Sequence, residues 1–249
     1  MDGIYLDEVG SHVTQYCYNP SHNHEHPSVT VRGWRDLSSR VRRAIRKVKE
    51  DAVIYGEEVG CDYVMQFLDA SLSYLPRGIV HYLRFLYPEM KLLYIPRREY
   101  FHPEAAHIAL FNGMALYIQY PKRKLELPED YVTIMRKHKD AFFSLNVECD
   151  IPKPSELGLG EDYHRGWRDH YRVNRFWTQH KSVYTFYNEG DEVLSGPLFV
   201  MPYEEDVEVT DALTGEAVRT KRVGDRIVIE GELKPKETRC IVVRYDAGH

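Results

Sequence analysis

The chain has 249 residues, of which 43% are hydrophobic and 29% are charged, and its formal net charge is −5. This composition allows a sizeable buried core in one or two domains, and the interspersed charges argue against a nucleic-acid-binding protein. The four cysteines are far apart and form no CxxC pair, which argues against a zinc site and against a disulfide scaffold. We find no apolar run long enough to span a membrane and no signal-peptide pattern.

The first predicted strand covers residues 3–6 and stops at an acid, Asp7. The same pattern returns at residues 52–56, which are followed by Glu57 and Glu58. A predicted helix lies between these two runs, and the order strand, helix, strand is typical of a βαβ unit with parallel strands. Both acidic ends then lie on one rim of the sheet, where (β/α) barrels build their active sites.

The helix between the strands is predicted over residues 36–49. Asp36 or Ser38 can cap its N-terminus. Its apolar positions recur at i, i+4 and i+7 and predict one buried face: Val41, Ile45 and Val48. The arginines and lysines of this region are interpreted as the solvated outer face of the helix, not as a nucleic-acid patch.

A long loop, residues 11–35, precedes this helix and contains histidines at alternate positions, His22, His24 and His26. A metal site needs convergent ligands with a fixed geometry, whereas a run of histidines in a loop is more typical of a polar binding rim. We therefore expect the loop to bind substrate, and we expect no metal ion and no cofactor.

The chain up to residue 150 continues the alternation of strands and helices. The further predicted elements are a short helix within 59–72 that contains Asp69, a helix over 79–86, a strand over 91–95, a helix over 103–111 with Asn112-Gly113 as its C-cap, a strand over 114–120 and a helix over 128–145. Residues 1–150 are therefore predicted to form one parallel α/β domain.

The remainder of the chain has a different pattern. Pro and Gly residues mark a linker with an irregular aromatic connection over 151–180. Short alternating runs split by turns then predict an antiparallel β-sandwich over 181–249. Its predicted strands cover residues 183–187, 198–201, 207–210, 226–229 and 240–243.

Three motifs occur in order along the first half of the chain. They are Gly3-x-Tyr5-x-Asp7, then Cys17-Tyr18 with His22-x-His24, then Glu58 with Asp69 at the eleventh position after it. Together they resemble an uncharacterised bacterial family of glycoside-hydrolase-like (β/α)-barrel proteins, distantly similar to endo-α-N-acetylgalactosaminidases and other α-glycosidase barrels. The resemblance covers residues 3–120, and the C-terminal part is similar to the β-sandwich that such enzymes carry.

The resemblance implies a fold of which this chain supplies only a part. Residues 1–150 would be the C-terminal part of a TIM-type (β/α)8 barrel, about strands 4 to 8. The first three strands would then have to come from preceding sequence or from a partner chain, because an open half-barrel exposes strand edges. We leave the location of the protein open between the cytoplasm and secretion.

The resemblance also implies a glycosidase active on an oligo- or polysaccharide. The nucleophile position falls on Asp7 and the acid/base position on Glu58, with Glu57 as the rival, since side chains alternate along a strand and only one of the two can face the barrel axis. A retaining mechanism is expected, with Glu58 kept protonated by partial burial and by the Asp7 charge. The candidate substrate-binding residues are His22, His24, Trp34, Tyr63, Asp69, Arg97 and Tyr100.

Other functions remain open or are disfavoured. The aromatic candidates can be packing residues, and Asp69 can cap a helix or pair with Arg77. The same pocket can serve a non-catalytic carbohydrate-binding or interaction protein, and the distance between the two carboxyl groups discriminates the two functions. A Gly-x-Ser-x-Gly elbow, a His-Glu-x-x-His motif and a Gly-rich phosphate loop are absent from the sequence. We expect neither nucleic acid nor membrane as a partner.

Overall fold

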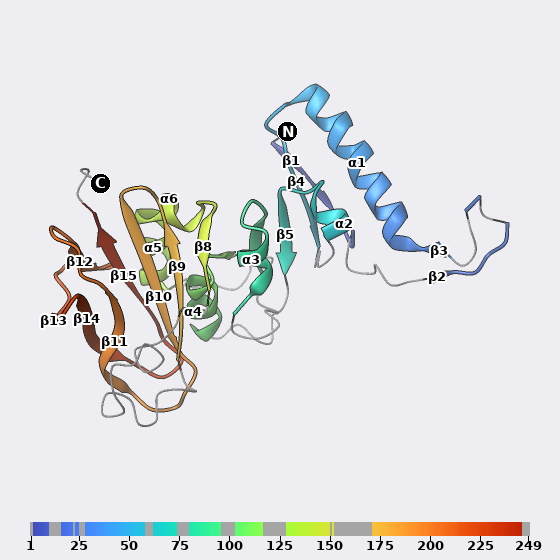
Figure 1. The fold of residues 1–249 in the computed structure, drawn as a ribbon. Helices are drawn as coiled ribbons and strands as arrows, with labels where there is room; N and C mark the ends of the chain where they lie inside the picture. The colour runs from blue at the N-terminus through green and yellow to red at the C-terminus, as the bar shows by residue number, and fades with distance from the viewer. Residues whose placement is uncertain are drawn as a thin grey trace. The chain divides into compact units, whose positions relative to one another are not determined.

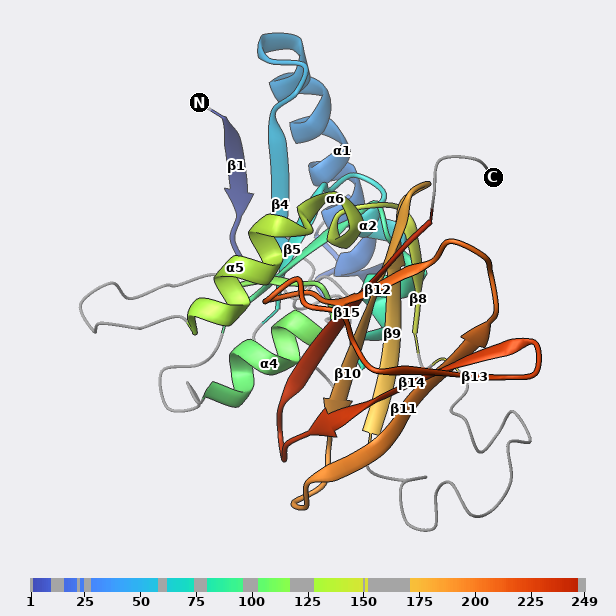
Figure 2. The same ribbon diagram turned by 90° about the vertical axis from the view of Figure 1, so that its left-hand side faces the viewer.

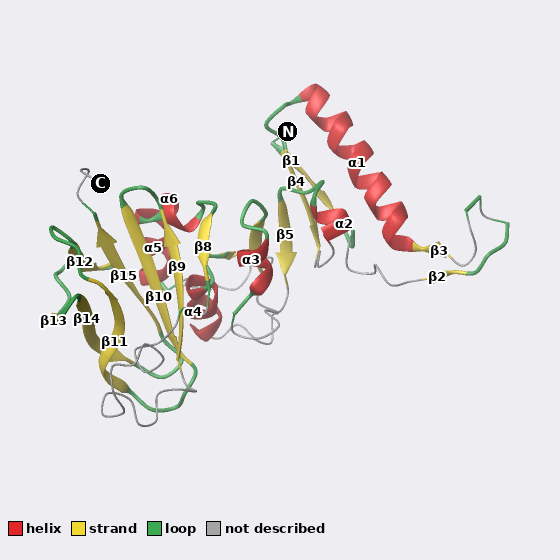
Figure 3. Cartoon of the chain, viewed as in Figure 1, coloured by secondary structure: helices red, strands yellow, loops and turns green. Residues whose placement is uncertain are grey.

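The structure is a computed structural model that describes residues 2–9, 16–21, 23–24, 28–57, 62–73, 80–95, 103–116, 128–149, 151 and 171–245. They form two compact units. Unit 1 comprises residues 1–76 and 89–95, and unit 2 comprises residues 77–88 and 96–249. Figure 1 traces the elements along the chain, and Figure 3 distinguishes helices from strands.

Unit 1 contains a parallel sheet. Four of its strands lie side by side in this order: β1 (Gly3–Leu6), β4 (Val53–Glu57), β5 (Ala70–Ser73) and β6 (Lys91–Tyr94). The register pairs Tyr5 with Tyr55 and Leu6 with Gly56. The prediction of two parallel strands that end at acids is confirmed for β1 and β4.

The helix between these strands, α1 (Thr30–Val48), begins six residues earlier than predicted. It follows the short strands β2 (Tyr16–Cys17) and β3 (Ser28–Val29), which pair with each other. Asp36 and Ser38 lie inside the helix, so neither caps it, and Ser38 is fully buried. The predicted apolar face is wrong at its last member, because Val48 is 90% exposed in the final turn.

The short helix predicted within 59–72 is present as α2 (Asp62–Met65), but it is only four residues long. The strand β5 (Ala70–Ser73), which was not predicted, follows it, and all four of its residues are buried. Asp69 therefore precedes a strand and does not lie within a helix.

Unit 2 contains two antiparallel sheets. The larger has the order β12-β15-β10-β9-β8 and the smaller the order β11-β14-β13. Their bounds are β8 (Asn146–Glu148), β9 (Tyr171–Trp177), β10 (Lys181–Asn188), β11 (Leu194–Pro202), β12 (Glu208–Asp211), β13 (Thr220–Val223), β14 (Arg226–Leu233) and β15 (Thr238–Arg244). Strand β9 lies inside the stretch for which an irregular connection was predicted.

The two sheets of unit 2 share one apolar core. Side chains from both contribute to it, among them Tyr171, Phe186, Leu198, Ile229 and Ile241, all with at most 1% exposure. Burial of this much apolar surface is the main stabilising contribution to such a unit.

Four helices and one short strand complete unit 2: α3 (Tyr82–Leu86), α4 (Pro103–Phe111), α5 (Glu129–Lys137), α6 (Lys139–Phe142) and β7 (Ala115–Leu116). Helices α4 and α6 contact the larger sheet, and Figure 2 shows α4 beside β10 and β15. The larger sheet is thus covered on both faces, which explains why seven of the eight residues of β10 are buried.

The C-terminus of α4 is anchored to this sheet. The carbonyl oxygen of Phe111 accepts hydrogen bonds from Asn174 Nδ2 at 3.0 Å and from Thr185 Oγ1 at 2.8 Å. Gly113 then adopts φ +59°, and a Cβ there would lie 2.8 Å from the ring of Phe176, so the predicted C-cap is confirmed. The helix predicted over 128–145 divides into α5 and α6 at His138.

These observations confirm a mixed fold with a parallel sheet followed by antiparallel sheets. Among the described strands the parallel sheet is open, and no closed barrel is formed. In the described parts of the chain, no helix is both long and apolar enough to cross a membrane.

Candidate active site

Two acids stand at the carboxyl ends of neighbouring strands in unit 1. Asp7 follows β1 directly, and Glu57 is the last residue of β4. Since Leu6 pairs with Gly56, Asp7 and Glu57 occupy equivalent positions one residue further along. Side chains at equivalent positions of parallel strands point to the same face of a sheet. Both carboxylates therefore share the face that carries Tyr5 and Tyr55.

The opposite face of β4 is the buried one. Ile54 is fully buried and Gly56 is buried, whereas Tyr55 and Glu57 are only partly buried. All four residues of β1 are partly buried, and Asp7 after them is exposed. Glu57 thus lies on the more accessible face of β4, and Asp7 is open to solvent. This arrangement lets a polar ligand approach carboxylates whose strands are held by a packed core.

Tyr5 contacts one of the two acids. Its hydroxyl donates to Oε2 of Glu57 at 2.8 Å. Burial raises the pKa of Tyr5 above its ordinary value, and the carboxylates of Glu57 and Asp7 raise it further, because negative charge nearby disfavours the ionised phenol. The hydroxyl of Tyr5 is therefore held protonated beside Glu57.

The turn after β1 supplies a second donor to the same oxygen. The backbone N–H of Glu8 donates to Oε2 of Glu57 at 3.1 Å. Glu8 has φ +54°, in the left-handed region that non-glycine residues seldom adopt. Strained backbone at a strand end is common where a site needs a particular orientation of the peptide. Here the strain accompanies an N–H group aimed at Glu57.

Tyr55 supports this arrangement from the neighbouring strand. Its ring stacks on that of Tyr5, with ring centroids 5.1 Å apart and an interplanar angle of 23°. Offset aromatic pairs of this kind restrict each other's orientation. The stacking therefore fixes the direction of the Tyr5 ring.

Tyr5 belongs to the first of the three motifs, but no role in the site was predicted for it or for Tyr55. A signal was present in the sequence. Tyr5-x-Asp7 and Tyr55-x-Glu57 have the same spacing, which places each tyrosine on the same face as the acid two residues later.

Asp69, predicted to bind substrate, lies at the opposite end of the sheet. Its Oδ1 pairs with Arg42 and Arg46 of α1, each at 3.0 Å, and its Oδ2 accepts the N–H of Ile54 at 2.9 Å. The chain that leaves β4 at its carboxyl end has returned to the amino end of β5 by this residue. The structure therefore does not bring Asp69 together with Asp7 and Glu57. Arg77, the pairing partner considered from the sequence, lies outside the described residues.

Two predicted substrate-stacking aromatics lie on helices. Trp34 is a partly buried residue of α1. Tyr63 belongs to α2, and the guanidinium carbon of Arg35 lies 4.7 Å from its ring centroid. This cation–π contact joins α1 to α2, which is the packing role considered from the sequence.

The remaining predicted site residues are described in part. His24 is exposed in the loop between β2 and β3. Glu58, His22, Arg97 and Tyr100 lie outside the described residues.

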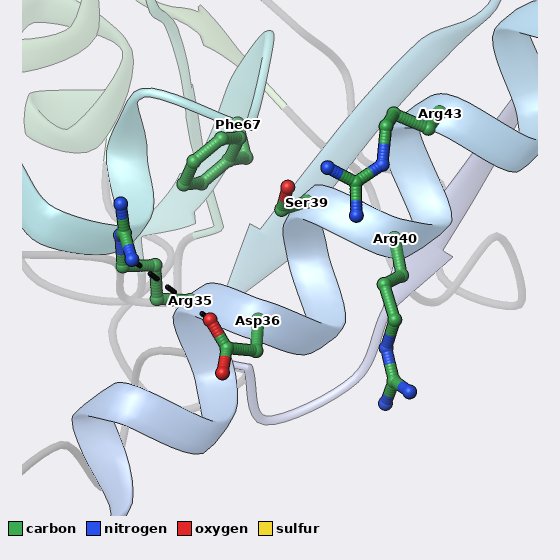
Figure 4. A pocket seen from close by; sticks show the side chains of 6 residues that line it. All are labelled: Arg35, Asp36, Ser39, Arg40, Arg43 and Phe67. Carbon is green, nitrogen blue, oxygen red and sulfur yellow. Dashed lines mark ion pairs between the residues drawn. The ribbon is translucent and has the colours of Figure 1, made fainter.

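A cavity of about 440 Å³ lies along α1. Its lining residues are Arg35, Asp36, Ser39, Arg40, Arg43 and Phe67. Figure 4 shows five of them on α1, with Arg35 and Asp36 joined by an ion pair of 3.9 Å. The lining includes neither Asp7 nor Glu57, and it has the charged character of a solvated helix face.

Within the described ranges, no cluster of three or more His, Cys, Asp and Glu residues could hold a metal ion. What the described side chains offer is a pair of carboxylates on neighbouring strands with a phenol hydrogen-bonded to one of them, a combination suited to nucleophilic and general acid/base chemistry.

No protein-family model matches the chain, and no curated protein matches it. Solved structures match it in fold. The cyclomaltodextrin glucanotransferase CldA aligns with a TM-score of 0.58 and 13% identity over 98% of this chain and 57% of its own. An α-amylase from H. orenii aligns with a TM-score of 0.57 and 10% identity over 98% of this chain and 61% of its own. A GH27 β-L-arabinopyranosidase from Geobacillus stearothermophilus aligns with a TM-score of 0.56 and 7% identity over 100% of this chain and 59% of its own.

These neighbours establish a glycoside-hydrolase-like fold. The chain spans 57–61% of their lengths. At identities of 7–13% the likeness concerns the fold alone, and function must be argued from the site. The neighbours support the glycoside-hydrolase part of the predicted resemblance but do not extend it to the endo-α-N-acetylgalactosaminidases.

Proposed function

We propose that the protein is a glycoside hydrolase that cleaves an O-glycosidic bond of an oligo- or polysaccharide, with Asp7 as nucleophile and Glu57 as acid/base. The observation that carries the proposal is the pair of acids Asp7 and Glu57 at the carboxyl ends of two adjacent parallel strands, with the hydroxyl of Tyr5 2.8 Å from Glu57. The glycoside-hydrolase-like fold supports the same class of activity.

Glu57 is preferred here to Glu58, the residue favoured from the motif spacing. Consecutive strand residues point to opposite faces, and Glu57 shares the face of Tyr5 and Asp7. The motif spacing relied on Asp69, which lies at the other end of the sheet. With that support removed, alternation alone favours Glu57. Glu58 remains the rival to be tested beside it.

We expect a retaining mechanism. Retaining glycosidases hold their two carboxyl groups about 5–5.5 Å apart, whereas inverting enzymes need about 6.5–9.5 Å to admit a water molecule. Asp7 and Glu57 follow the paired residues Leu6 and Gly56 of neighbouring strands, and neighbouring strands lie about 4.7–4.9 Å apart, so the shorter spacing is the expected one.

The proposed reaction has two steps. In the first, an oxygen of Asp7 forms a bond to the anomeric carbon while the glycosidic bond breaks, and Glu57 gives its proton to the departing oxygen. In the second, Glu57 takes a proton from water, the water oxygen bonds to the anomeric carbon, and the ester bond to Asp7 breaks. Both acids end the cycle in their starting protonation states.

The test is hydrolysis of a panel of aryl α- and β-glycosides by the full-length protein and by Asp7→Asn, Glu57→Gln and Glu58→Gln. Loss on the order of 10⁴-fold in Asp7→Asn and Glu57→Gln, with Glu58→Gln much less affected, is expected. Azide should rescue Glu57→Ala and give a glycosyl azide with the substrate's anomeric configuration, because the ester to Asp7 still forms.

Asp51→Asn is the matched control, since Asp51 is an exposed acid of the same unit that pairs with Lys49 at 2.7 Å. It should keep the rate of the unsubstituted protein. Binding of an oligosaccharide without cleavage would instead favour the carbohydrate-binding alternative, and a large loss confined to Glu58→Gln would transfer the acid/base role to that residue.

A further inference from the structure

The charge on helix α1 has one sign over most of its length. Residues 37–48 include no acid, and their cations are Arg40, Arg42, Arg43, Arg46 and Lys47. A helix face that meets only solvent usually carries charges of both signs, because like charges three or four residues apart repel each other. Since the net charge of the chain is −5, this row is a local excess of positive charge that attracts anions.

Only part of the row is neutralised within unit 1. Arg42 and Arg46 pair with Asp69 at 3.0 Å each. In the part of the chain that the structure describes, the other two arginines, Arg40 and Arg43, are exposed and form no ion pair. Their mutual repulsion is therefore uncompensated, and an anionic ligand would relieve it.

Two cavities follow the row and meet at Arg43. One is the cavity of about 440 Å³ described above, and the other, of about 400 Å³, is lined by Arg42, Arg43, Arg46 and Lys47. Helix α1 leads from the carboxyl end of β1 to the amino end of β4, so its first turns lie at the end of the sheet that carries Asp7 and Glu57 (Figure 1). A chain-like ligand in both cavities would extend along α1 towards that end.

The larger cavity offers more than positive charge. The hydroxyl of Ser39, the carboxylate of Asp36 and the ring of Phe67 line it together with the arginines (Figure 4). The guanidinium carbon of Arg35 lies 5.9 Å from the centre of the Phe67 ring, so a charge and an aromatic ring share one surface.

This lining matches an acidic sugar unit. The sugar ring has an apolar face for Phe67, its hydroxyl groups can donate to Asp36, and a carboxylate on it can accept charge-assisted hydrogen bonds from guanidinium groups. A phosphodiester group of DNA or of a lipid has no hydrogen to donate, so Asp36 would only repel it.

We propose that α1 binds an acidic polysaccharide, with one carboxylate-bearing sugar unit in the larger cavity and further units along the arginine row. The inference names the substrate class of the proposed glycosidase and therefore rests on that function. The polymer would be held by α1 while one of its glycosidic bonds is presented to the acids at the strand ends.

The test is calorimetric titration of the full chain carrying Asp7→Asn, in which the proposed cleavage is blocked. The acidic probes are polygalacturonate, alginate and hyaluronate, and the neutral probes are soluble starch and xylan. At least one acidic polysaccharide should bind, with an affinity that falls as the salt concentration rises, and the neutral ones should bind much more weakly. Binding of no acidic probe, or equal binding of neutral ones, would overturn the inference.

A pair of matched variants locates the site. Arg40→Gln combined with Arg43→Gln removes two exposed cations and should weaken binding of the acidic polysaccharide about tenfold. The control, Arg219→Gln combined with Lys221→Gln, makes the same change of charge at exposed residues of unit 2 and should leave the affinity unchanged. An equal loss in both variants would mean that only the overall charge matters, which contradicts a site on α1.

Asp36→Ala distinguishes a glycan from other polyanions by the sign of its effect. It should weaken binding of the acidic polysaccharide about fivefold, because a hydrogen-bond acceptor for the sugar hydroxyls is lost. It should not weaken binding of duplex DNA or of phosphatidylglycerol vesicles. Tighter binding of the polysaccharide in this variant, or DNA or vesicles bound more tightly than any polysaccharide by the unsubstituted helix, would reject the acidic glycan as the ligand.

These measurements need no turnover, so the two proposals can fail separately. Binding of an acidic polysaccharide by a protein that cleaves no glycoside would refute the proposed function and leave the site on α1. Cleavage of aryl glycosides without binding of any acidic polysaccharide would leave the function and refute the inference.

Discussion

Tyr5 in unit 1 and Tyr187 in unit 2 each place a hydroxyl 2.8 Å from a glutamate, Glu57 and Glu104 respectively. Burial and the glutamate raise the pKa of both tyrosines. Their surroundings differ, however. Tyr187 is fully buried against Phe111, whereas Tyr5 is partly exposed at a strand end beside a second acid. The same bond can therefore serve stability in one unit and chemistry in the other.

The difference extends to other polar groups. In unit 2, buried polar side chains such as Asn174 and Thr185 bond backbone carbonyls inside the packed layers. In unit 1, Asp7 is exposed and Glu57 is only partly buried, at the ends of two neighbouring parallel strands. Substitutions should accordingly affect stability in unit 2 and activity at the strand ends of unit 1.

The largest effect on stability is expected for Phe176→Ala in unit 2. The Phe176 ring is fully buried, 5.1 Å from Phe142 and 5.8 Å from Phe85. Removing it should lower the free energy of unfolding of unit 2 by about 3–5 kcal/mol, because the cavity cannot be filled by its neighbours. Urea denaturation followed by hydrogen exchange of each segment measures this. Phe143→Ala, which removes a side chain that is 40% exposed, is the control and should lower the free energy of unfolding much less.

Asp69→Asn should have the next largest effect, confined to unit 1. It weakens the pairs with Arg42 and Arg46 that tie α1 to the start of β5, and these groups are only partly screened by water. We expect a loss of about 1–3 kcal/mol in unfolding free energy, with kcat for an aryl glycoside unchanged. The control Asp51→Asn should lower the free energy of unfolding by less than about 0.5 kcal/mol. A fall in kcat or a rise in KM without loss of stability would restore Asp69 as a substrate-binding residue.

Tyr187→Phe sharpens the comparison with Tyr5→Phe. It removes a hydrogen bond to Glu104 inside unit 2 and should lower the unfolding free energy by about 1 kcal/mol, without moving the pH profile of activity. Tyr5→Phe should do the reverse, since its ring remains stacked and its bond lies at an accessible strand end. Chemical denaturation and the pH dependence of kcat/KM, measured on both variants, would contradict the comparison if the two behaved alike.

The smallest effect on stability is expected on lowering the pH. Burial lowers the pKa of His138 and of His81 below the ordinary value, and Lys181, Lys137 and Arg244 near His138 act in the same direction. The folded state thus binds fewer protons than the unfolded state, so their contribution to stability is complete above about pH 6.5 and is lost as the pH falls below it.

The free energy of unfolding should change by a fraction of the about 1.4 kcal/mol per pH unit that the binding of one whole proton would give. Thermal unfolding between pH 7.5 and 5.5 measures it. In His138→Gln, which can still donate to the carbonyl of Ala212, the slope should flatten. An unchanged slope in this variant would show that other groups cause the acid sensitivity.

Much of the fold was accessible from the sequence because local signals were strong. Strands β1 and β4 are apolar runs ended by acids, and α4 ends at a glycine with φ +59°. Strand β5 was missed because it is only four residues long and alternates with serines, which gives a weak apolar signal. Strand β9 was missed because it lies within an aromatic stretch that resembled an irregular connection.

The candidate site, like the fold, was predictable from the sequence only in part. The sequence by itself determined that Asp7 and Glu57 follow strands of one βαβ unit, since that depends only on local pattern and on the parallel connection of the strands. Only the tertiary structure decided that the register pairs Leu6 with Gly56, that the Tyr5 hydroxyl donates to Glu57, and that Asp69 faces Arg42 at the far end of the sheet. Register and side-chain contacts arise from packing between segments distant in the chain, which no local pattern encodes.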